Sequence, residues 1–274
     1  MPEGPEIKIA ADKIKKAIAF KPIKEIFFAF DRLKIYEDIL VKQLVTAVDT
    51  KGKGMLIRFD NGLSIYSHNQ LYGKWMIRKA YSYPETKRQL RLAIHNQDKS
   101  ALLYSASDIE VLDKEGISSH PFLSRLGLDV LDSNTTPKKV KARLLDKSFG
   151  RRRFTSLFLD QRFLAGLGNY LRSEILFVAQ VHPTLRPVDC SEQQISALAK
   201  AAIKLPQQSY KTAGITNDLK LVEKLKAKGY KRQDYRYWVF GRDNRPCYVC
   251  NTSIIKEVSG GRRYYFCPFC QGDR

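Results

Sequence analysis

The chain has few acidic residues, few histidines and no long apolar run. The charge balance and the missing apolar run limit the classes of protein to which the chain can belong. Its 274 residues contain 28 Asp and Glu against 48 Lys and Arg, which leaves a formal net charge of +20. A compact body with this charge repels itself unless a polyanion is near, so nucleic acid or an anionic membrane surface is the expected partner. The alternative is a charge that serves only solubility, although acidic surfaces serve that purpose better.

No stretch approaches the ~18 consecutive apolar residues of a membrane-spanning helix. The start of the chain, 1–6, also lacks the basic and apolar segments of a signal peptide. We therefore expect a cytoplasmic monomer, associated with the nucleoid if its source is bacterial, with no membrane partner. In that compartment five cysteines favour metal binding or free thiols over a disulfide framework.

The pattern of the first 132 residues predicts a β-rich domain with a leading helix. Gly4 suits the cap of this helix, Pro5 suits its first position, and apolar residues at helical spacing continue to about Phe20. Asp-Asn-Gly at 60–62 predicts the turn of a hairpin. Short strands that indicate a sandwich or barrel are expected at 26–30, which forms a buried run, and at 55–59, 63–66, 90–95 and 101–104.

From residue 133 the pattern becomes helical, so the predicted fold class is α+β. The segment 211–236 is basic and polar, and we interpret it as a mobile loop or linker. The expected domains are an N-terminal β-sandwich at 1–132, a helical domain at 133–237 and a C-terminal finger at 238–272. Helices are expected from Thr136-Pro137 through Leu144, at 155–163, at 170–179 after the turn 166–169, and from the capping box 191–194 to about Leu205.

Two Cys-x-x-Cys pairs, separated by 16 residues, lie near the C-terminus. This spacing lets four thiolates converge as a tetrahedron, which predicts one structural Zn²⁺. The alternative, a pair of redox dithiols, needs a thioredoxin-like βαβ pattern that the sequence lacks. Strands at 253–256 and 263–266 suit a hairpin between the pairs, and we assign Cys190 no role. The expected zinc ligands are Cys247, Cys250, Cys267 and Cys270.

Several motifs occur together in one order along nearly the whole chain. They are Met1 to Glu6, Ser67-His68-Asn69-Gln70-Leu71-Tyr72-Gly73, Tyr104 to Glu110, His120 to Leu123, Leu159 to Gln161, Gly166 to Arg172, and the finger. In that order the chain resembles the formamidopyrimidine-DNA glycosylase/endonuclease VIII family, and Ser67 to Gly73 resembles the endonuclease VIII branch in particular. The resemblance implies an N-terminal β-sandwich, a helix–two-turn–helix domain and a zinc-finger hairpin.

The resemblance implies a bifunctional DNA glycosylase/AP lyase of base excision repair whose nucleophile is Pro2. Removal of Met1 would leave Pro2 as a secondary amine with a pKa of roughly 7.7–8.0 before the helix start lowers it. Such an amine attacks a sugar carbon to form a Schiff base. Glu3 is implied as the proton-transfer group, and Lys53 and Arg262 as groups that assist β,δ-elimination. Read without the resemblance, Pro2 merely resists proteolysis, Lys53 is a turn lysine and Arg262 lies on a solvated hairpin edge.

Chemistry on a base inside a duplex requires the nucleotide to be flipped out and its gap to be filled. The resemblance implies that Gln70, Leu71 and Tyr72 fill the gap, although alone they suit an ordinary β-turn. Asn169, after Gly166 and Gly168 at a helix start, suits phosphate binding. Arg125 matches a DNA-contacting arginine of the family or is a surface charge.

The resemblance implies double-stranded DNA with an oxidised pyrimidine, such as thymine glycol, as the substrate. Two alternatives stay open. One is an oxidised-purine glycosylase for 8-oxoguanine or formamidopyrimidine, because the segment 211–236 is longer than the endonuclease VIII branch leads us to expect. The other is a non-catalytic zinc-finger protein that binds nucleic acid.

Overall fold

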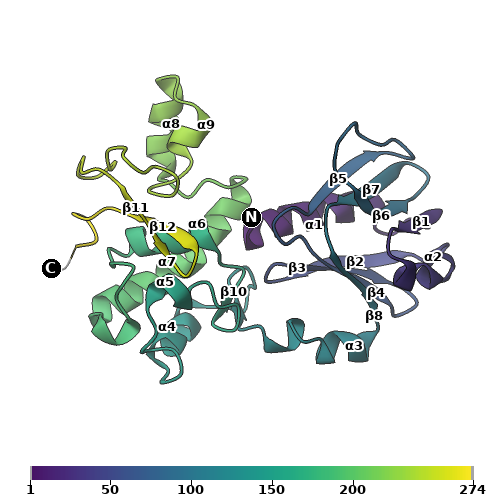
Figure 1. Ribbon diagram of the computed structural model, residues 1–274, viewed down its shortest axis with the longest axis horizontal. Coiled ribbons are helices and arrows are strands. Elements are labelled where there is room, and N and C mark those ends of the chain that lie inside the picture. The colour runs from purple at the N-terminus through teal and green to yellow at the C-terminus, as the bar shows by residue number, and fades with distance from the viewer. Residues whose placement is uncertain (1, 273–274) are drawn as a thin grey trace. The chain divides into compact units, whose positions relative to one another are not determined.

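A computed structural model of the chain describes residues 2–272 (Figure 1). Contacts divide the chain into two compact units, the first ending at Arg125 and the second beginning at Leu126. The expected domain limits at 132 and 237 stay predictions. The expected removal of Met1 concerns a residue outside the described range.

Within that range the first unit holds two four-stranded antiparallel sheets, ordered β1-β6-β7-β5 and β2-β3-β4-β8. This arrangement confirms the predicted β-sandwich with a leading helix. A 3₁₀ turn at Asp31–Leu33 and the short helix α2 (Ile35–Leu40) lie between the first two strands, and α3 (Lys114–Ser119) and a 3₁₀ turn at Leu123–Arg125 follow the last strand. The strands are β1 (Glu25–Phe28), β2 (Val45–Lys51), β3 (Gly54–Phe59), β4 (Ser64–His68), β5 (Lys74–Lys79), β6 (Leu90–His95), β7 (Lys99–Tyr104) and β8 (Asp108–Leu112).

The leading helix α1 (Gly4–Ile18) buries one face, on which Ile7, Ala11 and Ile14 are at most 2% exposed. Its N-cap is Glu3, so the expectation that Gly4 caps the helix was wrong by one residue. The reason is a reciprocal capping box, in which the Glu3 amide donates to Glu6 Oε2 at 3.0 Å.

The predicted hairpin between β3 and β4 is present. Gly62 adopts a φ of +87°, a left-handed conformation that favours glycine, and Asn61 Oδ1 accepts the Leu63 amide at 3.1 Å. The expected buried run at 26–30 was wrong, because β1 alternates between the two faces of its sheet. Ile26 and Phe28 are buried in the sandwich, whereas Phe27 is 38% exposed.

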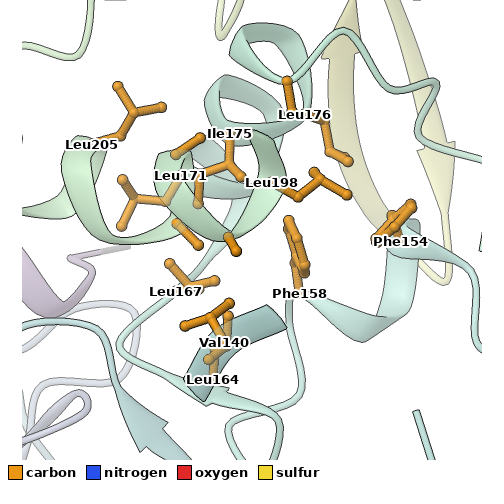
Figure 2. Packing of buried hydrophobic residues seen from close by; sticks show 14 of the residues in the cluster. Val140, Phe154, Phe158, Leu164, Leu167, Leu171, Ile175, Leu176, Leu198 and Leu205 are labelled. Carbon is orange, nitrogen blue, oxygen red and sulfur yellow. The ribbon is translucent and has the colours of Figure 1, made fainter. Parts of the chain in front are cut away.

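The second unit is built around α6 (Asn169–Val178) and α7 (Glu192–Lys211), which pack against each other. Figure 2 shows side chains of its core, among them Leu171 and Ile175 from α6, Leu198 from α7 and Phe158, which belong to one buried hydrophobic cluster. Among the helices of residues 2–272, none is both long and apolar enough to cross a membrane. The other elements are β9 (Leu128–Asp129), α4 (Pro137–Leu145), α5 (Phe154–Leu157), β10 (Leu164–Ala165), a 3₁₀ turn at Pro187–Asp189, α8 (Leu219–Ala227), α9 (Arg232–Tyr235), β11 (Ile255–Ser259) and β12 (Arg262–Phe266).

Two predicted helices have different lengths in the structure. The helix expected at 155–163 is only the short α5, because Asp160 accepts the Arg162 amide at 2.9 Å and turns the chain. The helix expected to end at Leu205 continues through Pro206 to Lys211. Its last turns are buried, and Ser209 Oγ lies 2.9 Å from the hydroxyl of Tyr170 on α6, so tertiary contacts outweigh the proline.

The interpretation of 211–236 as a mobile loop or linker was wrong, because this segment contains α8 and α9. Asp218 caps α8 by accepting the Leu221 amide at 2.9 Å, and Val222 and Leu225 form its buried face. The high lysine content reflects the exposed face of an amphipathic helix rather than the absence of structure.

Candidate active site and nucleic-acid interface

The N-terminal pair expected to carry the chemistry lies at the start of α1. Glu3 is 2% exposed and follows the half-buried Pro2 directly. A carboxylate beside a helix N-terminus is favoured by the partial positive charge of that end. The pair therefore places an amine position and a buried acid next to each other in the chain.

Lys53 lies in the tight turn between β2 and β3, where Gly52 adopts a φ of +59°. Its side chain is only 7% exposed, which is rare for a lysine in a hairpin turn. The next residue, Gly54, is the register partner of His68 on β4. Lys53 thus lies at the end of the sheet from which the predicted gap-filling loop departs.

That loop, Asn69 to Gly73, presents its middle side chains to solvent. Leu71 is 57% and Tyr72 is 69% exposed, although both are large and hydrophobic. The Gly73 amide donates to Asn69 O at 2.7 Å, and a Cβ at Gly73 would lie 2.5 Å from the same oxygen. Only glycine therefore closes this loop, and Gln70 is held in it with a φ of +48°.

Two side chains outside the loop fix Gln70. Ser107 Oγ donates to Gln70 Oε1 at 2.7 Å, and His68 Nδ1 accepts the Gln70 amide at 3.1 Å. Burial, and to a smaller extent the charge of Lys53, lowers the pKa of His68 to about 4. The imidazole is therefore neutral near pH 7, which leaves its Nδ1 free to accept the amide proton.

Arg125 is exposed at the end of the 3₁₀ turn Leu123–Arg125, the last residue of the first unit. Its Nε donates to Pro121 O at 2.8 Å. This contact holds one edge of the guanidinium of a side chain that is exposed.

In the second unit Asn169 is the first residue of α6, after Gly166 with a φ of +97°. Gln161 fixes the preceding loop, since its Oε1 accepts the Gly166 amide at 3.0 Å and its Nε2 donates to Leu167 O at 3.0 Å. Asn169 Oδ1 is buried with no hydrogen-bond partner within residues 2–272. A buried acceptor without a partner is costly, so this atom marks a place for a ligand or water.

Arg262 is exposed at the first position of β12, next to the turn glycines Gly260 and Gly261, which have φ values of +55° and +72°. The finger hairpin spans 255–259 and 262–266, so the first strand, expected at 253–256, begins later. Arg262 therefore lies at the tip of the hairpin.

Helix α6 holds this hairpin through Arg172, which is fully buried. Arg172 donates to Thr155 O and, at 2.7 Å, to Arg263 O, and its guanidinium lies 5.6 Å from the ring centre of Tyr264. Since Asn169 begins the same helix and Arg262 the same strand, these contacts hold two predicted DNA-contacting residues on one body.

A buried carboxylate on the same helix holds the chain segment that leads into the finger. Glu174 accepts the amides of Trp238, Val239 and Phe240 at 2.8, 2.9 and 3.0 Å, and the Thr216 hydroxyl at 2.5 Å. Four donors converge on one carboxylate that is 0% exposed. The chain between α9 and the cysteines is therefore anchored on α6.

The four predicted zinc ligands come together. All four Sγ atoms lie within 4.8 Å of one another. Cys250 Sγ lies 3.4 Å from Cys267 Sγ and 3.5 Å from Cys270 Sγ, and the Cys247–Cys270 separation is 3.9 Å. Tetrahedral Zn²⁺ with Zn–S bonds of about 2.3 Å requires sulfurs about 3.8 Å apart, so the donor set fits this ion.

Backbone amides support the thiolates of both Cys-x-x-Cys pairs. The Val249 amide donates to Cys247 Sγ and the Cys270 amide to Cys267 Sγ, each at 3.4 Å. Such contacts stabilise negative charge on sulfur, which is the form that binds a metal. The cluster can therefore hold a metal ion.

Two domain families match the chain. The formamidopyrimidine-DNA glycosylase N-terminal domain matches residues 1–107, and the formamidopyrimidine-DNA glycosylase H2TH domain matches residues 126–220. The chain belongs to the formamidopyrimidine-DNA glycosylase family, which makes it a DNA glycosylase and AP lyase of base excision repair.

Within the family, the chain is 47% identical over 271 residues to Endonuclease 8 of Salmonella enteritidis PT4, covering 99% of this chain and 100% of that protein. Endonuclease 8 of Salmonella arizonae is 46% identical with the same coverage. Among solved structures, MutM in complex with DNA containing carbocyclic 8-oxo-G has a TM-score of 0.81 at 22% identity, covering 99% of this chain and 100% of that one. The latter likeness concerns the fold alone.

The residues that position the site rather than form it were not predicted from the sequence. His68 and Ser107 support Gln70, while Arg172 and Glu174 support the finger. A signal for the last two was present, because a buried, mostly apolar helix with an arginine and a glutamate in its middle predicts buried hydrogen-bond networks.

Proposed function

We propose that Pro2 is the nucleophile that removes an oxidised base and then opens the DNA strand. Its secondary amine attacks C1′ of the damaged nucleotide, the N-glycosidic bond breaks, and the base leaves with a proton. The C1′–O4′ bond then breaks as O4′ takes up a proton, which opens the sugar ring and forms an iminium between Pro2 and C1′. The resulting iminium acidifies C2′, so loss of a C2′ proton expels the 3′ phosphate by β-elimination. A second elimination expels the 5′ phosphate, and hydrolysis of the iminium returns the free amine.

The observation that carries this proposal is the buried acid directly after residue 2. Glu3 is 2% exposed at the N-cap of α1, although glutamate is among the residue types that are least often buried. We assign Glu3 the transfer of protons to and from the opening sugar ring. Lys53, buried at 7% exposure, and Arg262, at the hairpin tip, are the cations proposed to stabilise the phosphates that leave.

For DNA recognition we propose that Gln70, Leu71 and Tyr72 enter the space that the flipped nucleotide vacates. Their exposure in a loop closed by Gly73 supports this role, because the protein leaves large apolar groups in water. Asn169 and Arg125 are assigned to phosphates on either side of the damaged nucleotide.

The metal is proposed to be one structural Zn²⁺ held by the four cysteines. Bound there, zinc closes the finger and takes no part in bond making, because four thiolates leave no open position. The substrate is proposed to be double-stranded DNA with an oxidised pyrimidine, which the identity to Endonuclease 8 proteins supports. The proposed acting form is a monomer.

Borohydride trapping tests the nucleophile. The protein is incubated with abasic duplex DNA and sodium borohydride, which reduces the iminium to a stable amine. We expect a covalent complex whose DNA-linked peptide begins at Pro2, and no complex with Pro2→Gly in a sample that still binds DNA. A methionine-extended N-terminus in the active protein would exclude this nucleophile. Rates on thymine glycol and 8-oxoguanine duplexes test the substrate, and faster release of 8-oxoguanine would reverse the proposed preference.

A further inference from the structure

The segment from Ala213 to Tyr237 carries positive charge that the proposed chemistry does not use. It contains seven basic and three acidic residues. Figure 1 shows α8 and α9 as a pair of helices at the edge of the second unit. The pair is therefore a separate structural element with its own charge.

Each acidic residue of this segment is already engaged. Asp218 caps α8, Glu223 pairs with Lys226 at 2.9 Å, and Asp234 pairs with Arg245. No carboxylate of the segment is left for the remaining lysines. Most of its positive charge is consequently uncompensated.

Three of those lysines form a row along α8 and its C-cap, Lys228. Lys220, Lys224 and Lys228 are four residues apart and all exposed, and none has an ion-pair partner among residues 2–272. Side chains at this spacing lie along one side of a helix, and at 1.5 Å per residue the row is about 12 Å long. Val222 and Leu225 are on the buried face, so the row is directed away from the protein core.

The row is held in place at its base. Gln208 Nε2 of α7 donates to Asn217 O at 2.8 Å, and Asn217 Nδ2 donates to Tyr235 O at 3.0 Å. The Thr216 amide donates to Arg236 O at 3.0 Å, and the Thr216 hydroxyl binds Glu174. Since these contacts tie α8 to α6 and α7, the backbone positions of the three lysines are fixed relative to these helices.

We propose that this row, Lys220-Lys224-Lys228, binds phosphates of duplex DNA away from the damaged nucleotide. The inference rests on the proposed function, since it requires DNA as the ligand. A duplex carries one charge per about 1.7 Å of its axis, so a 12 Å row meets several phosphates at once. Contacts of this kind supply affinity for any sequence and take no part in bond cleavage.

The test replaces the row in Lys220→Gln, Lys224→Gln, Lys228→Gln and compares it with Lys24→Gln, Lys34→Gln, Lys42→Gln, three exposed lysines of the first unit, of which Lys34 pairs with Asp31 at 3.0 Å. Both triple variants lose the same charge from exposed positions. The dissociation constant for an undamaged duplex is measured from 50 to 300 mM NaCl, a range chosen to resolve the slope of its logarithm against that of salt. The cleavage rate of abasic DNA is measured with the enzyme in saturating excess.

We expect the slope to decrease by about 0.9 for each lost phosphate contact, or about 2.7 for the row variant. The slope of the control variant should change by less than about 0.9, the value for one phosphate contact. The saturated cleavage rate should stay within twofold of wild type in both. A row variant whose slope equals that of wild type or of the control would overturn the proposal. So would a saturated rate more than tenfold slower, because the segment would then act at the reacting nucleotide. Failure of the Pro2 chemistry would show instead as absent trapping in the wild type.

Discussion

Replacing Glu174 by alanine should loosen the finger from α6 more than any surface change in the second unit. The substitution leaves three amides, those of Trp238, Val239 and Phe240, and the Thr216 hydroxyl without their acceptor. A buried donor without a partner costs about 1–3 kcal/mol, so the loss of four such hydrogen bonds costs at least about 4 kcal/mol. Since water entering the cavity and relief of the buried carboxylate offset part of the loss, we expect about 4 kcal/mol.

Thr216→Val is the matched control, because it removes one neutral donor and leaves the carboxylate with three amides. Its expected cost is about 1 kcal/mol. Glu174→Gln should fall between the two, since its amide oxygen accepts but its NH₂ group faces other donors.

The assay is urea unfolding followed by the fluorescence of Trp238. The chain has two tryptophans, so a Trp75→Phe background leaves Trp238 as the reporter of the second unit. With a slope of about 2 kcal/mol per molar urea, Glu174→Ala should lower the midpoint by about 2 M. A shift no larger than that of Thr216→Val would refute the reasoning that the three amides depend on this carboxylate.

Three further outcomes are expected. The folded-state pKa of His68, about 4, lies below its unfolded value of 6.5, so the stability that neutral His68 contributes is complete above pH 6.5. This contribution, at most about 3 kcal/mol, is lost as the pH falls toward 4. The unfolding free energies of wild type and His68→Asn, measured by urea melts, should therefore differ above pH 6.5 and converge at pH 4. Leu71→Ala should leave the melting temperature unchanged and slow base release from duplex DNA about tenfold in single-turnover assays, whereas an equal rate would mean that the side chain fills no gap. Cys250→Ser should lose the bound zinc and DNA binding, as measured by metal analysis and by gel shift, and wild-type affinity without zinc would contradict the role of the finger.

Features that depend on short stretches of chain were predictable. The Cys-x-x-Cys spacing brings two thiolates together locally, and the four sulfurs do converge. Apolar spacing after Pro5 and the Asn61-Gly62 pair predicted α1 and the β3–β4 turn, since helical periodicity and positive φ are local properties. The roles assigned to Pro2, Glu3 and the loop at Gln70 stay predictions.

The errors arose where a distant contact changed the outcome of a local pattern. The lysines of 219–228 suggested a loop, yet Val222 and Leu225 find a buried surface and Asp218 a cap, so α8 forms. The helix expected to end at about Leu205 continues to Lys211, because buried contacts carry α7 past Pro206.

By itself the sequence determined the family, the order of the elements and the identity of the metal donors, because these follow from residue type and spacing. The tertiary structure alone decided which side chains support them. Arg172 and Glu174 look out of place in an apolar helix until the partners brought by the fold, Arg263 O and the amides of 238–240, are known. A buried charge is stable only with such partners, and hydrogen bonds between residues 64 to 91 positions apart cannot be read from neighbouring residues.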